Sequence, residues 1–292
     1  YSFVDPKLQE QLDPAVKSIT LANPITSDMA IMRTTLWAGL LSVLSYNQKR
    51  QQSRGRFFET GLRFFYSKEQ VLQQEPMIAG VAMGTRWPEQ WGQPEQLIDF
   101  FDLKSDVEAI LTLSSAGNLK PDEVYRFIPA THPALHPGQT AEIYRGDEWI
   151  GVLGAVHPSL MQTLRSVLKF ELTPPIYLFE LRLTPLLKSQ PIYFKEISKY
   201  PSLRRDIAVV VSKTVSATQL LDCVKQSASD LLIDWQLFDV YQGKGIEPSQ
   251  KSIAIGLIFQ AFSRNLTDSE VDSVVEKIVS KLEQKLDATL RK

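Results

Sequence analysis

Cysteine is nearly absent from this sequence of 292 residues, and Cys223 is the single example. One cysteine excludes a disulfide framework and a cysteine metal cluster within the chain, so a reducing compartment is the simplest expectation. Long hydrophobic runs are missing too, because no apolar stretch approaches the ~18–20 residues that a membrane-spanning helix needs. The net charge is only −1. This balance argues against a protein that coats nucleic acid along its whole surface, although it permits a local basic patch.

Histidine is also scarce, with three in the chain, and two of them stand four residues apart at His132 and His136. That spacing is typical of a metal-binding pair on a helix. A proline follows each of them directly, and proline disfavours helical geometry in the residue before it. No cysteine and no HExxH glutamate is nearby, so a proline-shaped loop is favoured over a metal site.

Glycine-rich nucleotide motifs are incomplete. Gly151 and Gly154 lie in a hydrophobic strand pattern, and no helix with GxGxxG spacing follows them. The sequence Gly243-Lys244-Gly245 lacks the Walker spacing, and a tight turn explains it better. No Ser-His-Asp or Cys-His arrangement occurs at local spacing, and the sequence leaves open one assembled from distant residues.

The first 190 residues combine many short strand patterns with few helices. Helices are predicted for residues 1–14, with Asp5 as the cap, and for residues 36–51, 99–114 and 158–167. Val43 and Phe101 are assigned to the buried stripes of the second and third of these helices. Strands are predicted for residues 19–21, 56–65, 78–84, 124–128, 141–144, 149–156 and 176–181. Because helices and strands do not alternate regularly, the pattern favours the α+β class with an antiparallel sheet.

The rest of the chain, after a predicted linker at residues 185–194, has a clearer order of elements. Strands are predicted for residues 206–211, 231–240, 253–262 and 288–291, and helices for residues 216–227 and 267–286. Thr267 and Glu270 form a capping box, and Ser216 suits the other helix cap. The order β-α-β-β-α-β is that of the ferredoxin-like fold. This fold leaves one face of its sheet open, as single-stranded RNA modules do.

A basic and aromatic cluster precedes the first strand of this second region. It consists of Lys195, Lys199, Tyr200, Arg204 and Arg205. Such a cluster indicates a recognition surface on a rigid element, and a solvated strand edge is the plain alternative. Residues 195–292 carry 14 Lys and Arg against 13 Asp and Glu. Any RNA site here is therefore a local patch.

Several motifs, in one consistent order, resemble a known family. The segments YSFVDPK, LANPITSDMAIMRTTLWAGLLSVLSYN, RFFETG and HPALHPGQTAEIY are similar to the class II synthetase-like core of bacterial phenylalanyl-tRNA synthetase beta subunits. The segments SKYPSLRRDIAVVV, FDVYQGKGIEP and SRNLTDSEV are similar to the ferredoxin-fold anticodon-binding domain of the same subunit. The resemblance implies a class II-like domain at residues 1–190 and an anticodon-binding domain at residues 195–292. Because the family's subunits are longer on the N-terminal side, we expect a C-terminal part of one.

The resemblance also implies partners. In that family an alpha subunit binds phenylalanine and ATP with magnesium, catalyses aminoacylation, and pairs with beta in an (αβ)2 heterotetramer. The expected function is therefore a non-catalytic, cytoplasmic part of phenylalanine–tRNA ligase that supports the alpha subunit, binds tRNA(Phe) near the anticodon and itself binds no cofactor or metal. The candidate tRNA contacts are Tyr200, Arg204, Arg205, Tyr241, Lys244 and Arg264, and the candidates for subunit interface or fold support are Arg33, Trp37, Arg56 and Phe58.

The residues that carry class II catalysis are not matched here. A working second motif places an arginine two residues before a glutamate, and the residue two before Glu59 is Phe57. The passage that resembles the third motif, residues 179–185, contains no glycine and ends in proline. Without cations on the phosphates, adenylate formation has no charge stabilisation. The alternatives are an independent adenylate-forming enzyme, which this mismatch disfavours, and a free-standing RNA-binding or scaffold paralogue.

Overall fold

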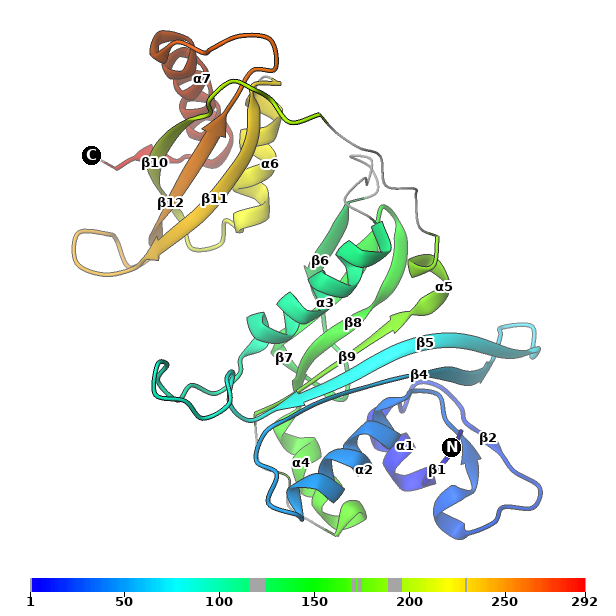
Figure 1. Cartoon of the computed structure of the whole chain (residues 1–292). Helices are drawn as coiled ribbons and strands as arrows, with labels where there is room; N and C mark the ends of the chain where they lie inside the picture. Colours follow the sequence, from blue (N-terminus) through cyan, green and yellow to red (C-terminus); the bar gives the residue numbers. More distant parts are fainter. Residues whose placement is uncertain are drawn as a thin grey trace. The chain divides into compact units, whose positions relative to one another are not determined.

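A computed structural model describes residues 2–115, 124–169, 172, 175–188, 196–228 and 230–291 (Figure 1). The chain divides into two compact units, Tyr1–Tyr193 and Phe194–Lys292. The predicted linker lies mostly outside the described residues, as does Lys195 of the basic cluster. Its first residues belong to the short helix α5 (Leu183–Leu186), and Leu186 is buried in the first unit's core. The linker prediction is therefore wrong at that end.

A six-stranded sheet forms the centre of the first unit, in the order β4-β5-β9-β8-β7-β6 (Figure 1). Its strands are β4 (Gly55–Tyr66), β5 (Leu72–Met83), β6 (Tyr125–Pro129), β7 (Leu135–Arg145), β8 (Glu148–Val156) and β9 (Ile176–Arg182). Every neighbouring pair is antiparallel, which confirms the predicted fold class. The inner strands β8 and β9 are buried along most of their length because helices cover both faces of the sheet.

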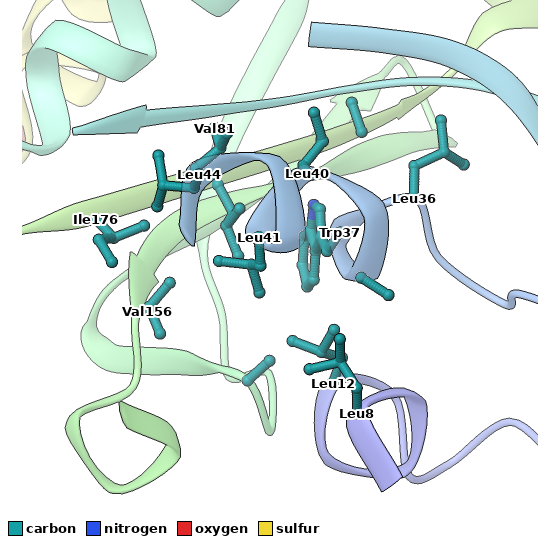
Figure 2. Packing of buried hydrophobic residues seen from close by; sticks show 14 of the residues in the cluster. Leu8, Leu12, Leu36, Trp37, Leu40, Leu41, Leu44, Val81, Val156 and Ile176 are labelled. Atoms are coloured by element: carbon teal, nitrogen blue, oxygen red, sulfur yellow. The ribbon is translucent and has the colours of Figure 1, made fainter. Parts of the chain in front are cut away.

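The two faces of this sheet pack against different helices. Helices α1 (Pro6–Leu12), α2 (Trp37–Gln48) and α4 (Pro158–Leu168) share one core cluster, whereas α3 (Phe100–Ser115) and α5 share the other. Figure 2 shows how α2 places Trp37 and Leu41 between the sheet and Leu12 of α1. The Trp37 side chain is 1% exposed, so α2 carries the largest buried side chain of this core.

Two residues assigned to buried helix stripes lie at the surface. Val43 of α2 is 44% exposed and Phe101 of α3 is 71% exposed, so both predictions are wrong. In α3 the buried stripe runs through Leu103, Val107 and Leu111, and Phe101 lies outside it by one residue. A helix turns about 100° per residue, which is enough to carry a side chain from the core edge to solvent.

A small sheet and a capped helix open the chain. Strands β1 (Phe3–Val4), β2 (Ile19–Thr20) and β3 (Ile31–Met32) pair in the order β1-β3-β2, and a 3₁₀ turn, η1 (Ser27–Met29), precedes β3. The predicted cap is confirmed, because the Asp5 carboxylate accepts the Lys7 and Leu8 amides at 2.7 and 3.2 Å. This cap satisfies two N–H groups that helix α1 leaves free at its first turn.

The second unit has the predicted ferredoxin-like order. Its elements are β10 (Leu203–Ser212), α6 (Ala217–Ser227), β11 (Leu232–Tyr241), β12 (Gln250–Phe259), α7 (Asp268–Leu286) and β13 (Thr289–Leu290). The antiparallel sheet runs β11-β12-β10-β13 (Figure 1). Both predicted caps are confirmed: Ser216 with Gln219, and Thr267 with Glu270, form capping boxes.

Helices α6 and α7 cover one face of this second sheet. Its core includes Ile207, Val209 and Val211 of β10 together with the apolar residues of β12, namely Ile253, Ile255, Leu257 and Phe259. Side chains alternate between faces along a strand, so the intervening residues of β10 and β12 lie on the face that α6 and α7 leave uncovered. Among the described residues, no helix has the length and apolarity required to cross a membrane.

Candidate nucleic-acid interface

The uncovered face of the second sheet has a floor of small side chains, and we call it the open face. Its centre consists of Ala208 on β10, which pairs with Ala254 on β12, and of Ser252 and Gly256 on the same face of β12. Small residues here leave room above the backbone for long side chains from the neighbouring strands. The floor therefore determines which groups form the outer surface.

One guanidinium lies above the glycine of this floor. A Cβ atom on Gly256 would come within 2.8 Å of the Arg204 guanidinium, so only glycine allows the arginine to lie flat there. Arg204 donates to Asp206 at 2.7 Å, and its Cζ is 5.4 Å from the centre of the Phe238 ring. That distance is within the range of a cation–π contact. Phe238 itself is 48% exposed, which leaves ring area open to solvent.

A second cation–ring pair lies further along β11. The Arg291 amide donates to the Ala208 carbonyl at 2.8 Å, which fixes Arg291 beside β10. Its Cζ is 5.0 Å from the centre of the Tyr241 ring on the opposite edge strand. Together the Arg291 and Tyr241 side chains extend across Ala208 and Ala254, which lie between them. The Tyr241 hydroxyl donates to the Lys244 carbonyl at 3.2 Å.

A β-bulge brings Tyr241 to this face. Leu237 pairs with Ile255 and Val240 with Ile253, both on the helix-covered side, while Tyr241 pairs with Ser252 on the open side. The register shift between Leu237 and Asp239 inserts one extra residue, Phe238, and so reverses the alternation that follows it. Phe238 and Arg291 were not predicted as contacts from the sequence. The adjacent apolar residues Leu237 and Phe238 are the signal that indicates such a bulge.

The other predicted tRNA contacts lie elsewhere. Arg205 pairs with Leu257 on the helix-covered side, and it donates to Asp268 and Asp272 of α7 at 2.5 and 2.9 Å. Lys244 is exposed in the turn between β11 and β12. The structure thus brings Arg204 and Tyr241 to one face and separates Arg205 from them.

Two further candidates lie near the Phe259 end of β12. Arg264 donates to both oxygens of Glu270 at 2.6 and 2.8 Å, and these bonds lower the pKa of Glu270 to about 2. Tyr200 is held by its backbone, because its carbonyl accepts from Gln260 and its amide donates to Ser198. Arg264 and Tyr200 therefore lie at the border of the sheet and not over its centre.

The charge of the open face is mixed. Among the described residues, the cations of this face are Arg204, Arg291 and the nearby Lys244. Asp206, Asp234 and Asp239 occupy outward positions on the same strands. A phosphate backbone would gain little net attraction from such a surface. Stacking on exposed rings and hydrogen bonding to base edges depend far less on net charge. The face is therefore better suited to unpaired bases than to a duplex backbone.

The first unit's candidates separate into buried and exposed residues. Arg33 is 4% exposed and donates to Glu59 and to the Leu62 carbonyl at 2.5 and 2.9 Å. The Trp37 indole donates to the Phe179 carbonyl at 3.0 Å. Both side chains therefore support the fold from inside. By contrast, Phe58 is 74% exposed on the edge strand β4.

Three further residues singled out in the sequence make structural contacts. Arg56 reaches from β4 to both oxygens of Asp106 on α3 at 2.8 Å. His132 accepts the Ala134 amide at 3.2 Å through Nδ1, as His136 does from Gly138 at 3.0 Å, so both imidazoles close proline-containing turns. In the part of the chain that the structure describes, no three His, Cys, Asp or Glu side chains are grouped as a metal site would require.

Comparison with known families gives a specific result. Residues 1–183 match the family described as phenylalanyl tRNA synthetase beta chain CLM domain. The chain belongs to this family. Residues 198–291 match a second family, described as ferredoxin-fold anticodon binding domain. This match includes the sheet that carries the open face. The resemblance drawn from the sequence motifs is thereby confirmed for both parts of this beta-chain sequence.

Individual beta-chain relatives match over the whole length. The phenylalanine–tRNA ligase beta subunit of Pseudomonas fluorescens is 49% identical over 292 residues, which is 100% of this chain and 35% of that relative. The subunit of Nitrosococcus oceani is 48% identical over 271 residues, 93% of this chain and 33% of the relative. The chain thus spans about a third of the length of these relatives. A pyrrolysyl tRNA synthetase structure from Desulfitobacterium hafniense aligns with a TM-score of 0.44 and 14% identity, over 64% of this chain and 57% of that one.

Proposed function

We propose that this chain acts within phenylalanine–tRNA ligase as a non-catalytic part of its beta subunit. The match of residues 1–183 to the beta-chain family supports this role most directly. In this proposal an alpha subunit supplies the aminoacylation site and uses ATP and magnesium, in a cytoplasmic (αβ)2 assembly. The first unit supports that subunit, and the exposed Phe58 on edge strand β4 is a contact candidate.

The second unit, in the same proposal, binds tRNA(Phe) near the anticodon. The open face carries this assignment, since it presents the Phe238 and Tyr241 rings, each beside a guanidinium, on a rigid sheet. The two rings are three residues apart on β11, roughly 10 Å along a strand. That spacing allows two unpaired nucleotides to stack on them in one binding mode. Arg204 and Arg291 are then the groups that hydrogen-bond base edges or phosphates.

If the open face binds tRNA, the adjacent residues Arg204 and Arg205 should contribute differently to the affinity. Arg204 lies on the open face, whereas Arg205 lies on the other side in contact with α7. Arg204→Ala should therefore weaken tRNA binding, and Arg205→Ala should leave the affinity close to that of the parent chain. Lys244, Arg264 and Tyr200 remain candidate contacts at the ends of the sheet.

Binding of tRNA(Phe) by the reconstituted alpha–beta assembly tests the proposal. Stacking contributes about 1–3 kcal/mol per base, so Phe238→Ala and Tyr241→Ala should each weaken binding about 5- to 150-fold. The described residues place three cations on this surface, so the slope of log affinity against log salt should change by about 2 when all three are removed. The open face is the wrong surface if every open-face variant binds tRNA(Phe) as tightly as the parent chain and Arg205→Ala binds it more weakly.

The role as a synthetase subunit has its own test. The chain is co-purified with an alpha subunit, and phenylalanylation is measured with the alpha subunit alone and with the chain added. We expect a stable complex that Phe58→Asp weakens, with Val43→Asp as the control at another exposed apolar position. A chain that binds RNA but no alpha subunit would instead be a free-standing RNA-binding protein. ATP–pyrophosphate exchange by the chain alone would contradict the non-catalytic assignment.

A further inference from the structure

A small cavity lies within the first unit, far in sequence from the open face. It is lined by side chains from β4, β7, β8 and β9 and from the residues after α1, with a volume of about 130 Å³. A single water needs only about 10–15 Å³ measured in this way. The cavity is therefore large enough for a molecule of several non-hydrogen atoms.

Glu180 forms part of the wall of this cavity. The residue is 5% exposed, and its Oε1 atom accepts the Leu36 amide at 2.7 Å and the Thr35 hydroxyl at 3.0 Å. Its other oxygen, Oε2, accepts no hydrogen bond from the residues that the structure describes. A carboxylate oxygen that accepts no hydrogen bond is a strong acceptor for any donor that enters the cavity.

The remaining lining groups make the cavity anionic. Asp13 and Glu142 add two carboxylates to that of Glu180. Burial lowers the pKa of His132, which keeps its imidazole neutral near pH 7. Arg63 is the cation among the described lining residues, but its guanidinium donates to Glu75 at 2.9 and 2.6 Å. Arg63 also lies 6.0 Å from the centre of the Trp149 ring, and its charge opposes the rise of the Glu180 pKa, but the three carboxylates outnumber it.

We propose that this cavity binds a small organic cation, a primary amine or a guanidine, with the charged group on Glu180 and the carbon skeleton against Trp149. An ammonium or guanidinium supplies the donor that Oε2 lacks, and an indole wall favours an alkyl cation through both burial and cation–π attraction. A bare metal ion is a poorer fit, because the described carboxylates and His132 do not form a metal-ligand cluster. The site is independent of the proposed role in tRNA binding.

The same geometry makes binding pH-dependent. Burial raises the pKa of Glu180 to about 7, and it also raises the pKa of Asp13. A bound cation favours the ionised form, so affinity should increase as Glu180 loses its proton. The ionised fraction increases from about 0.1 at pH 6 to about 0.9 at pH 8, which predicts about ten-fold tighter binding at pH 8. Arg63, His132 and Glu142 also face this carboxyl.

Nuclear magnetic resonance of the ¹⁵N-labelled chain provides the test. The probe is n-butylamine in phosphate buffer, and the signal is the Trp149 indole N–H, assigned by its loss in Trp149→Phe. A ligand of this size is expected to bind with a Kd on the order of 1 mM. The neutral analogue n-butanol should bind at least about ten-fold more weakly, because it has no positive charge for Glu180.

Variants then identify the residue responsible. Glu180→Gln keeps the size and the Oε1 acceptor, and it should weaken n-butylamine binding about ten-fold or more and remove the pH dependence. Glu283→Gln, at an exposed position on α7, is the matched control and should change nothing. Asp13→Asn provides a second variant if Glu180→Gln fails to fold. Absence of a shift at 50-fold the expected Kd, equal binding of n-butanol, or unchanged affinity in both cavity variants would overturn the proposal.

Discussion

Replacing Glu180 with glutamine should alter how the first unit's stability depends on pH. Folding moves the pKa of this carboxyl from an ordinary 4.5 to about 7, chiefly through burial. The folded state therefore holds the proton more tightly than the unfolded state. The resulting stabilisation is fully present below pH 4.5 and is lost as the pH rises through 7. The full shift corresponds to about 3 kcal/mol, since one pKa unit is about 1.4 kcal/mol.

Glutamine is the appropriate substitution because it resembles the protonated acid. Its carbonyl can accept the Leu36 amide and the Thr35 hydroxyl as Glu180 does. At pH 4.5 we expect the two proteins to have similar free energies of unfolding. At pH 8 the Glu180→Gln chain should be more stable by up to about 3 kcal/mol. Groups that titrate elsewhere contribute equally to both chains and cancel in the difference.

Urea unfolding between pH 5 and pH 8 measures this difference. Trp235→Phe removes the tryptophan of the second unit, so the remaining fluorescence reports on the first unit alone. The buffer must contain no amine, because Tris is a primary amine and is a possible ligand of the cavity. A difference between the two chains that stays constant with pH would show that Glu180 does not titrate between its unfolded value and pH 8. A difference of opposite sign would show that the carboxylate is stabilised by the fold.

Three further predictions concern packing, capping and surface charge. Leu257→Ala should destabilise the second unit by about 2–5 kcal/mol, since Leu257 is 0% exposed. Thermal unfolding followed by Trp235 fluorescence measures this loss of stability, and a loss below about 1 kcal/mol would contradict the described core. Thr267→Ala removes a helix cap and should cost about 1 kcal/mol in the same assay, whereas Thr267→Ser should restore most of the loss. Arg56→Ala breaks a half-exposed ion pair and should cost less than about 1 kcal/mol in urea unfolding; a larger effect would mean that Arg56 has a further role.

Local patterns predicted the second unit well. The capping box of Thr267 and Glu270 marks the start of α7 within the sequence itself, and the strand and helix order then follows from hydrophobic periodicity. These signals are local, because each depends on residues within one turn or one strand. The ferredoxin-like order could therefore be read directly from the sequence.

The residues of the candidate site are brought together by contacts between distant parts of the sequence. Arg291 contacts Tyr241 only because β13 and β11 lie on opposite edges of one sheet with alanines between them. The separation of Arg204 from Arg205 follows from strand alternation and could have been predicted. The position of Arg205 against α7 required the packed helix. Glu180 lies in an apolar strand sequence, and only tertiary structure shows that its carboxyl reaches a cavity.

The bulge at Phe238 makes the composition of the open face depend on chain length. Because the bulge holds one extra residue, deletion of Asp239 alone would restore regular alternation on β11 and leave Tyr241 opposite Ser252 on the open face. Deletion of two residues at the bulge would leave the strand one residue short and turn the tyrosine toward the helices. The open face should therefore tolerate a single-residue deletion here better than a double one.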